Sequence, residues 1–197
     1  MPTAWTKKKG IIRHYDETAA AYDALYREEQ EQKIHEILKH MIIHCSDYVL
    51  DAGCGTGFLF EHIRKRAGRI VGVDLSKGLL RIALSRTKQA EAGNISLVQA
   101  DIDHLPFKER MFDKVFALTV LQDSSDLDVT LKEITRIAKN ESTLAVTGLK
   151  KVFTEERFKQ ALTEEGLEPS ILDTPEQVKD LISICWRHVD GHYKISL

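Results

Sequence analysis

The chain has 197 residues, of which 43% are hydrophobic and 29% charged, so it is long enough for one domain with a buried core. Its formal net charge of −2, with acidic and basic residues interspersed, argues against the broad basic surface of a dedicated nucleic-acid-binding protein. The longest apolar runs, such as residues 115–121, are too short to span a bilayer, and no apolar signal sequence follows Met1. We therefore expect a cytoplasmic protein without a membrane segment.

The N-terminal part of the chain is predicted to be helical. Between Asp16 and His44, apolar residues recur at spacings of three and four, which indicates one or two amphipathic helices. We expect residues 1–45 to form a helical lid and residues 46–197 to form a sheet core, with both belonging to a single domain.

Strands and helices alternate after the N-terminal helices. Strands are predicted at 48–52, 69–76, 95–102, 112–121 and 142–149, and helices at 58–67, 77–92 and 127–139. This alternation predicts a mostly parallel sheet with helices on both faces. A further helix, capped by Thr154, precedes two apolar runs at 168–174 and 181–189. Their linker is too short for a helical crossover, so we expect the seven-stranded sheet to finish antiparallel.

Three glycines, at positions 53, 55 and 57, stand directly behind the strand at 48–52. Glycine in a strand or helix interior costs roughly 0.5–1 kcal/mol relative to alanine, so another requirement must retain these residues. A glycine turn between a strand and a helix lets a ligand approach the helix N-terminus. Phe58 stands where a dinucleotide-binding turn needs glycine or alanine, and no triphosphate-binding loop is present, so NAD and nucleoside triphosphates are disfavoured.

Four motifs in order, "VLDAGCGTG" (49–57), "IVGVDLS" (70–76), "LVQADIDHLPF" (97–107) and "FDKVFAL" (112–118), resemble those of the class I S-adenosylmethionine-dependent methyltransferases. The resemblance extends from about residue 15 to about residue 186. It implies a Rossmann-like α/β fold and S-adenosyl-L-methionine as methyl donor, with S-adenosyl-L-homocysteine as product. It does not identify the methyl acceptor.

The resemblance also implies which residues contact the methionine end of the cofactor. Gly53, Gly55 and Gly57 would lie beneath it, and Asp51 would lie near its ammonium group. A carboxylate suits a cation there, and the free N–H groups at the helix start suit an anion. Cys54 matches the small residue common in this motif, and we expect no nucleophilic role for it because no partnered histidine is evident.

Acidic residues at two further strand ends are expected to hold the nucleoside. Asp74 resembles the residue that accepts hydrogen bonds from both ribose hydroxyls, and Leu75 would lie against the adenine face. Asp101 resembles the residue that receives the adenine amino group, and Ile102 would cover the ring. At the fourth strand, Ala117 is expected to line the cofactor pocket beside Leu118 and Thr119.

Three tyrosines in the predicted lid, Tyr15, Tyr22 and Tyr26, fall at spacings of seven and four and so share one helical face. Our hypothesis is that Tyr15 contacts the methionine end and Tyr22 borders the acceptor pocket. The alternative is ordinary packing against the sheet, because aromatic stripes usually belong to the core. If the acceptor must lose a proton, the candidate bases are His14, Tyr15, Tyr22 and Asp123, and nothing in the sequence separates them.

The cysteines and histidines predict neither disulfides nor a metal site. Cys45, Cys54 and Cys185 form no CxxC pair, and the histidine pairs lack a third ligand. The pairs are His40 with His44 and His188 with His192. The basic stretches Lys7–Lys9 and Lys150–Lys151 are interpreted as solvated surface charge.

The absence of one sequence motif after the fourth strand narrows the class of methyl acceptor. Methyltransferases acting on exocyclic base amines or glutamine usually carry an Asn/Asp-Pro-Pro-Tyr/Phe loop after the fourth strand, where this chain has "ALTVLQD" (117–123). We therefore favour a small-metabolite acceptor. A tRNA or protein methyltransferase that works with a partner subunit, docked along the edge formed by the third strand, remains open. So does a module that binds the cofactor without transferring a methyl group.

Overall fold

The computed structural model describes residues 4–175 and 177–187. Within this part of the chain, seven strands form one sheet in the order β3-β2-β1-β4-β5-β7-β6. The strands are β1 (Tyr48–Ala52), β2 (Arg69–Asp74), β3 (Ile95–Gln99), β4 (Phe112–Ala117), β5 (Ala138–Leu149), β6 (Leu167–Ile171) and β7 (Asp180–Arg187). The helices are α1 (Ala4–His40), α2 (Phe58–Ile63), α3 (Lys77–Gln89), α4 (Leu127–Ile137) and α5 (Glu155–Glu164), with a 3-10 turn η1 (Leu121–Asp123) after β4.

The sheet confirms the predicted topology. Strands β1 to β5 pair in parallel, and β7 runs antiparallel to both of its neighbours, β5 and β6. Strand β3 lies at one edge, as expected. Three predicted strands were too long, because β2 ends at Asp74, β3 at Gln99 and β4 at Ala117. The residues that follow them leave the sheet, and several of these line the cavity described below.

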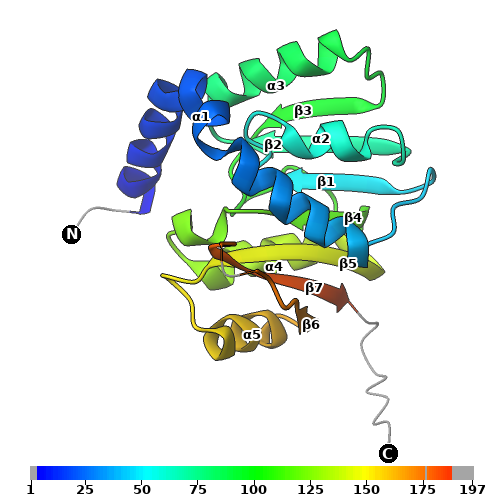
Figure 1. The fold of residues 1–197 in the computed structure, drawn as a ribbon. Helices are drawn as coiled ribbons and strands as arrows, with labels where there is room; N and C mark the ends of the chain where they lie inside the picture. The colour runs from blue at the N-terminus through cyan, green and yellow to red at the C-terminus, as the bar shows by residue number, and fades with distance from the viewer. Residues whose placement is uncertain (1–3, 176, 188–197) are drawn as a thin grey trace, which may run out of the picture.

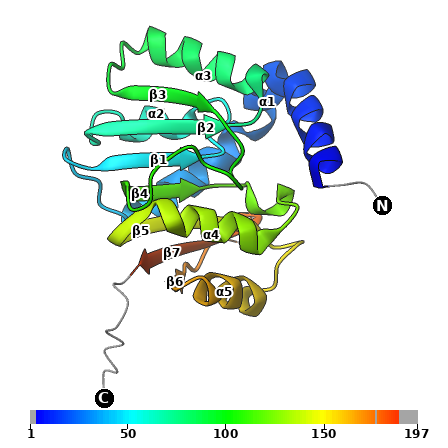
Figure 2. The same ribbon diagram turned by 180° about the vertical axis from the view of Figure 1, so that it is seen from behind.

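Helices cover both faces of the sheet (Figures 1 and 2). Helices α4 and α5 pack on one face through buried side chains that include Ile134 and Phe158. The other face is covered by α2, α3 and the C-terminal half of α1, through side chains that include Ile37, Phe60 and Ala83. The expected α/β architecture with helices on both faces is therefore confirmed. Among the helices of the described residues, none has the length and apolar character needed to cross a membrane.

Helix α1 is a single helix of 37 residues that begins well before the predicted start at Asp16. The periodicity did not reveal residues 4–15 because few of them are apolar. Buried apolar side chains concentrate in the C-terminal half, at Ile34 and Ile37, whereas Ala19 is the buried apolar residue of the N-terminal half. That half lies beside the carboxyl ends of the strands (Figure 1). It is therefore placed where the predicted lid should be.

Three helix starts carry side-chain caps. Ser76 accepts a hydrogen bond from the backbone N–H of Leu79, Asp126 from that of Val129, and Thr154 from that of Arg157. The predicted cap at Thr154 is confirmed. Asp126 is solvent-exposed, and it contacts none of the residues discussed below as binding residues.

Candidate functional site

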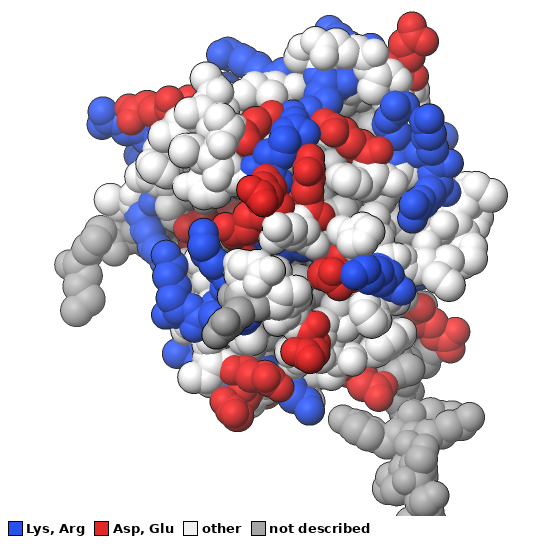
Figure 3. Space-filling model, in the orientation of Figure 1, with Lys and Arg blue, Asp and Glu red and all other residues white. Residues whose placement is uncertain are grey.

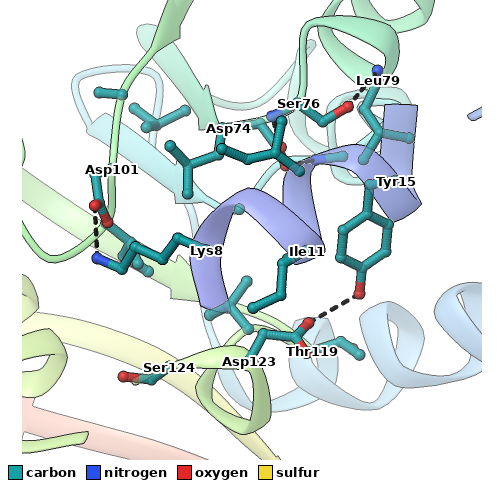
Figure 4. A pocket seen from close by; sticks show the side chains of 18 of the residues that line it. Lys8, Ile11, Tyr15, Asp74, Ser76, Leu79, Asp101, Thr119, Asp123 and Ser124 are labelled. Atoms are coloured by element: carbon teal, nitrogen blue, oxygen red, sulfur yellow. Dashed lines mark hydrogen bonds and ion pairs between the residues drawn. The ribbon is translucent and has the colours of Figure 1, made fainter. Parts of the chain in front are cut away.

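A cavity lies between the N-terminal half of α1 and the carboxyl ends of the parallel strands (Figure 4). Its wall combines residues from four strand ends with residues from α1, which include Ile11 and Tyr15. The order of the strands reverses between β1 and β4, and this switch point is where open α/β sheets bind ligands. A smaller second cavity shares Tyr22, Gly53, Gly55 and Leu118 with the first and reaches Asp51.

The glycines of the turn after β1 leave open space beside the cavity at Gly55 and allow close packing of α2 at Gly57. All three glycines have positive φ, with values of 81° at Gly53, 53° at Gly55 and 80° at Gly57. Gly55 faces open space, because a Cβ atom there would come no closer to another residue than 4.0 Å from the ring of Tyr22. Gly57 lines neither cavity, and a Cβ atom there would lie 2.6 Å from the ring of Phe60. Packing of α2 against the turn therefore requires this glycine, and its expected contact with the cofactor stays a prediction.

Asp74, at the end of β2, joins the glycine turn to the start of α3. Its carboxylate accepts hydrogen bonds from the backbone N–H groups of Gly55 (2.9 Å) and Ser76 (2.8 Å). Burial raises the pKa of Asp74, although these hydrogen bonds oppose the shift. The backbone N–H of Leu75 also stabilises the carboxylate, and two carboxylate oxygens offer about four acceptor positions in all, so acceptor capacity remains for a ligand. Leu75 also lines the cavity.

Asp51 is a buried carboxylate that no hydrogen-bond donor among the described residues satisfies. It lies in the central strand β1, is 3% exposed and lines the second cavity. Desolvation, together with the nearby charge of Asp74, raises the pKa of Asp51 to about 8. An unpaired carboxyl group in such a place favours a cationic ligand, which would lower its pKa again.

Of the two remaining residues expected at the cofactor pocket, Cys54 lines a cavity and Ala117 does not. Cys54 lines the second cavity, and burial raises its pKa well above the ordinary value, so the thiolate is disfavoured. Ala117 is fully buried in the core on the side of α4 and lines neither cavity. The chain reaches the cavity at Leu118 and Thr119, after β4 has ended, and the expected contact of Ala117 with the cofactor stays a prediction.

Lys8, which the sequence analysis treated as solvated, lies inside the site. Its Nζ atom is 2.5 Å from Asp101 Oδ2 and 2.5 Å from Asp103 Oδ2, and only 9% of the residue is exposed. Burial lowers the pKa of Lys8, but the hydrogen bonds to the two carboxylates outweigh burial and raise it overall. Asp101 and Ile102 line the cavity as predicted, yet Asp101 already has a partner. Any ligand amino group at Asp101 must share this carboxylate with Lys8 or displace it.

The tyrosines of α1 share one face, as predicted. The ring centroids of Tyr15 and Tyr22 are 6.1 Å apart, and those of Tyr22 and Tyr26 are 4.9 Å apart. The Tyr15 hydroxyl donates a hydrogen bond to Asp123 Oδ2 (2.9 Å; Figure 4). Burial and the charge of Asp123 raise the pKa of Tyr15, which therefore stays protonated and is a poor base.

The four candidate bases are not equivalent in the structure. Tyr15, Tyr22 and Asp123 line the cavity, whereas His14 is exposed and only touches the outer edge of the Tyr15 ring. Burial also raises the pKa of Tyr22. The second carboxylate oxygen of Asp123 has no hydrogen-bond partner among the described residues, so Asp123 is the best placed proton acceptor.

Polar contacts fasten the N-terminal half of α1 to the sheet domain. Asp16 accepts hydrogen bonds from Ser76 Oγ (2.5 Å) and from the backbone N–H of Gly78 (2.8 Å). Asp23 pairs with Arg86 of α3. These contacts, with those of Lys8 and Tyr15, close the cavity through hydrogen bonds and ion pairs rather than through apolar packing.

Neither disulfides nor a metal centre is found in the described residues. Cys45, Cys54 and Cys185 are free thiols, and no group of three or more His, Cys, Asp or Glu side chains there is arranged to hold a metal ion. His188 and His192 lie outside the described residues. On the face that carries α1, α2 and α3, basic and acidic side chains are intermixed (Figure 3).

Comparisons with known proteins converge on one family. Residues 50–146 match the family described as "Methyltransferase domain". Malonyl-acyl-carrier protein O-methyltransferase from Yersinia pestis is 30% identical over 139 residues, which are 71% of this chain and 50% of that protein. The chain spans about half the length of this relative and of two others that it matches.

Two solved structures share the fold at low sequence identity. One is the putative methyltransferase of Haloferax volcanii in complex with the Trm112 methyltransferase activator, with a TM-score of 0.79, 20% identity, and coverage of 89% of this chain and 98% of that one. The other is magnesium protoporphyrin IX methyltransferase from Synechocystis PCC 6803 with bound SAM. Its TM-score is 0.77 at 17% identity, and the match covers 95% of this chain and 100% of that one.

Proposed function

Because the chain belongs to the class I S-adenosylmethionine-dependent methyltransferase family, we propose that it transfers a methyl group from S-adenosylmethionine to a small-molecule acceptor in the cavity beneath α1. One observation carries the proposal. Most of the residues expected to hold the cofactor line one cavity, which also includes Tyr15, Tyr22 and Asp123; they are Gly53, Gly55, Asp74, Leu75, Asp101 and Ile102. Asp51 lines the adjoining second cavity, which shares Gly53 and Gly55 with the first. The expected donor-binding residues and the candidate acceptor-side residues are therefore neighbours.

The chemistry of the side chains fits the cofactor. Asp74 is a carboxylate with acceptor capacity for the ribose hydroxyls, and the open space beside Gly55 would admit the methionine end. The unpaired carboxyl group of Asp51 suits the ammonium group of the methionine part. Asp101 would receive the adenine amino group between Leu75 and Ile102.

When bound, the cofactor supplies an electrophilic methyl group on a sulfonium. The protein must then align the acceptor atom with it, and good alignment is worth on the order of 7–11 kcal/mol in favourable cases. The acceptor atom would bond to this methyl carbon, and the sulfur would keep the electron pair of the S–C bond. Where the acceptor carries a proton, Asp123 would take it, while Tyr15 keeps this carboxylate in place.

A transfer assay tests the proposal. The protein would be incubated with S-adenosylmethionine labelled in the methyl group and with separate pools of small molecules, RNA and protein. We expect label in the small-molecule pool. Label in RNA or protein would contradict the small-molecule acceptor. Binding of S-adenosylhomocysteine without transfer to any pool would instead support a cofactor-binding module that does not transfer a methyl group.

Because the pKa of Asp51 is raised, binding of the cofactor should release protons at low pH and take up protons at high pH. The amine of S-adenosylhomocysteine lies next to a free carboxylate, which keeps its pKa above the value of about 8 for a chain N-terminus. At about pH 6.5 the carboxyl group in the free protein is protonated, so forming its ion pair with S-adenosylhomocysteine should release about one proton. Above the pKa of the ligand amine, the Asp51 carboxylate is already ionised and the amine is neutral, so binding should take up about one proton. Affinity should therefore rise as the pH approaches about 8 and fall once the pH exceeds the pKa of the ligand amine.

Calorimetry in buffers of different ionisation enthalpy measures this proton exchange directly. Asp51→Asn, which cannot ionise, should lose the proton release at low pH and bind more weakly. Absence of proton release from the wild-type protein at about pH 6.5 would contradict the placement of the ammonium group at Asp51.

The lid hypothesis predicts that ligand protects residues 14–26 from hydrogen exchange. The N-terminal half of α1 is held mainly by polar contacts, and segments with few buried apolar contacts open at low free-energy cost. A ligand that fills the cavity adds contacts to Tyr15 and Tyr22, so their amides should exchange more slowly when S-adenosylhomocysteine is added. Residues 34–40, which Ile34 and Ile37 anchor in the apolar core, serve as the internal control. Equal exchange with and without ligand, together with full activity of Tyr15→Phe and Tyr22→Phe, would make the segment structural only.

A second candidate function is favoured by one structural relative. We infer the alternative of a catalytic subunit that works with a small activator protein, because a neighbour with a TM-score of 0.79 is in complex with the Trm112 methyltransferase activator. Strand β3 has an unpaired edge at the end of the sheet, which could accept a strand from a partner. Co-expression with that activator and size-exclusion chromatography would test it. Separate elution would leave the single-chain enzyme as the proposal.

A further inference from the structure

Thr119 is held in a strained conformation at the wall of the cavity. Its φ of 59° lies in the left-handed region, which β-branched residues rarely adopt. Its backbone N–H donates to Thr147 Oγ1 (2.8 Å), and its carbonyl oxygen accepts from Gln122 Nε2 (2.6 Å). Strain of this kind costs about 1–3 kcal/mol and persists only where the surroundings enforce it. The fold therefore fixes the direction of this side chain.

The hydrogen bonds of the Thr119 side chain leave its proton free. Lys33 Nζ donates to Thr119 Oγ1 (2.6 Å), and so does Gln30 Nε2 (3.3 Å). A threonine hydroxyl has two lone pairs and one proton, so both lone pairs are used. Among the described residues, none accepts a hydrogen bond from this hydroxyl. Because Thr119 lines the cavity, its proton is available to a molecule bound there.

The charges around this hydroxyl favour a neutral partner. Lys33 is fully buried and pairs with Asp180 (2.8 Å) and Glu29 (3.5 Å), and Glu29 also pairs with Lys179 (2.9 Å). Two lysines and two carboxylates balance, so the cluster behind Thr119 adds no net positive charge. Several carboxylates also face the two cavities, at Asp51, Asp74, Asp101 and Asp123. Lys8 also lines the first cavity and pairs with Asp101, and the raised pKa keeps Asp51 protonated near neutral pH, so the unpaired charges are those of Asp74 and Asp123. Beside these two carboxylates a neutral carbonyl oxygen is favoured over an anionic one.

We propose that Thr119 selects methyl acceptors that carry a neutral carbonyl oxygen close to the group that is methylated. Thr119 donates the hydrogen bond, and Lys33 and Gln30 are positioning residues that turn its proton into the cavity. Thr119 lies beside Asp123 and Tyr15, away from Lys8 and Asp101 (Figure 4). It is thus on the acceptor side of the cavity. This inference rests on the proposed function and adds the chemical class of the acceptor to it.

A matched pair of probes tests the inference without any variant. Meta-hydroxyacetophenone and meta-ethylphenol have the same phenol and nearly the same size, but only the first has a carbonyl oxygen. Their affinities would be measured by ligand-observed NMR with the protein saturated with S-adenosylhomocysteine. We expect the carbonyl compound to bind about tenfold more tightly, the value of one hydrogen bond of ordinary strength. Equal affinities, or no binding of either compound, would overturn the inference.

Two substitutions connect the preference to the hydroxyl. Thr119→Val keeps the β-branched shape and the backbone strain but removes the donor, so the preference for the carbonyl compound should disappear. Thr119→Ser keeps the donor and should retain it. Both variants are measured, like the wild type, with the protein saturated with S-adenosylhomocysteine, so that a change in the affinity for this ligand does not enter the comparison of the two probes. A preference that persists in Thr119→Val would overturn the inference.

Failure of the inference and failure of the proposed function give different results. A protein that does not bind S-adenosylhomocysteine contradicts the proposed function itself. A protein that binds it, transfers methyl groups and shows no preference between the two probes contradicts the role of Thr119 only. If Thr119→Val does not fold, the wild-type comparison and Thr119→Ser still decide the matter.

Discussion

Replacing Asp74 with alanine is expected to weaken binding of S-adenosylhomocysteine by at least about 100-fold. The carboxylate would accept two hydrogen bonds from the ribose, each worth roughly 1.5–3 kcal/mol because the acceptor is charged. Asp74 also accepts hydrogen bonds from the N–H groups of Gly55 and Ser76, so the variant loosens the turn on which the ligand rests. Isothermal titration calorimetry measures the loss. The affinity of Asp74→Asn, which keeps one oxygen, should lie between those of Asp74→Ala and the wild type.

A matched control separates binding from folding. Asp126 is also an aspartate that accepts a backbone hydrogen bond at a helix start, but it is exposed and does not line the cavity. Asp126→Ala should therefore lower the melting temperature, since a lost cap costs about 0.5–2 kcal/mol, and leave the affinity unchanged. If Asp74→Ala binds as tightly as the wild type, the assignment of the ribose to Asp74 is wrong.

Replacing Gly55 with valine is expected to abolish cofactor binding while the fold persists. The position is bounded by the Tyr22 ring at 4.0 Å and otherwise faces open space, so the valine side chain would enter the volume reserved for the ligand. The φ of 53° adds backbone strain of about 1–3 kcal/mol, which the domain should tolerate. Crosslinking to labelled S-adenosylmethionine and circular dichroism measure the two effects separately.

The control for this substitution is Gly166→Val. Gly166 also has a positive φ, of 76°, and a Cβ atom there meets nothing within 4 Å, but it lies after α5 and lines neither cavity. The two variants therefore share the backbone strain and differ in their distance from the site. Gly166→Val should lose stability and keep its crosslinking. Crosslinking of Gly55→Val at the wild-type level would show that the binding site lies elsewhere.

The features that the sequence predicted are those encoded within short segments. Each strand of the parallel sheet is a local apolar run followed by a turn, so the alternation of elements was visible in order. Asp74 and Asp101 stand at or just after the carboxyl ends of β2 and β3, and parallel pairing brings such positions to one edge of the sheet. For the same reason Gly53 and Gly55 could be assigned to the cavity before the structure was known.

Other features depend on how distant segments pack. Lys8 meets Asp101 across 93 residues, and Lys33 meets Asp180 across 147 residues, so no local pattern marks either lysine as buried. Gly57 and Ala117 lie within the recognised motifs, yet the Phe60 ring and the core beneath α4 decide their surroundings. The residues around Thr119 come from α1, β5 and η1. The sequence by itself determined the sheet and the turn that line the site, because strand ends and turns are local. Only the tertiary structure decided which charges and hydroxyls face the ligand, because a long helix carries side chains to partners far away in the chain.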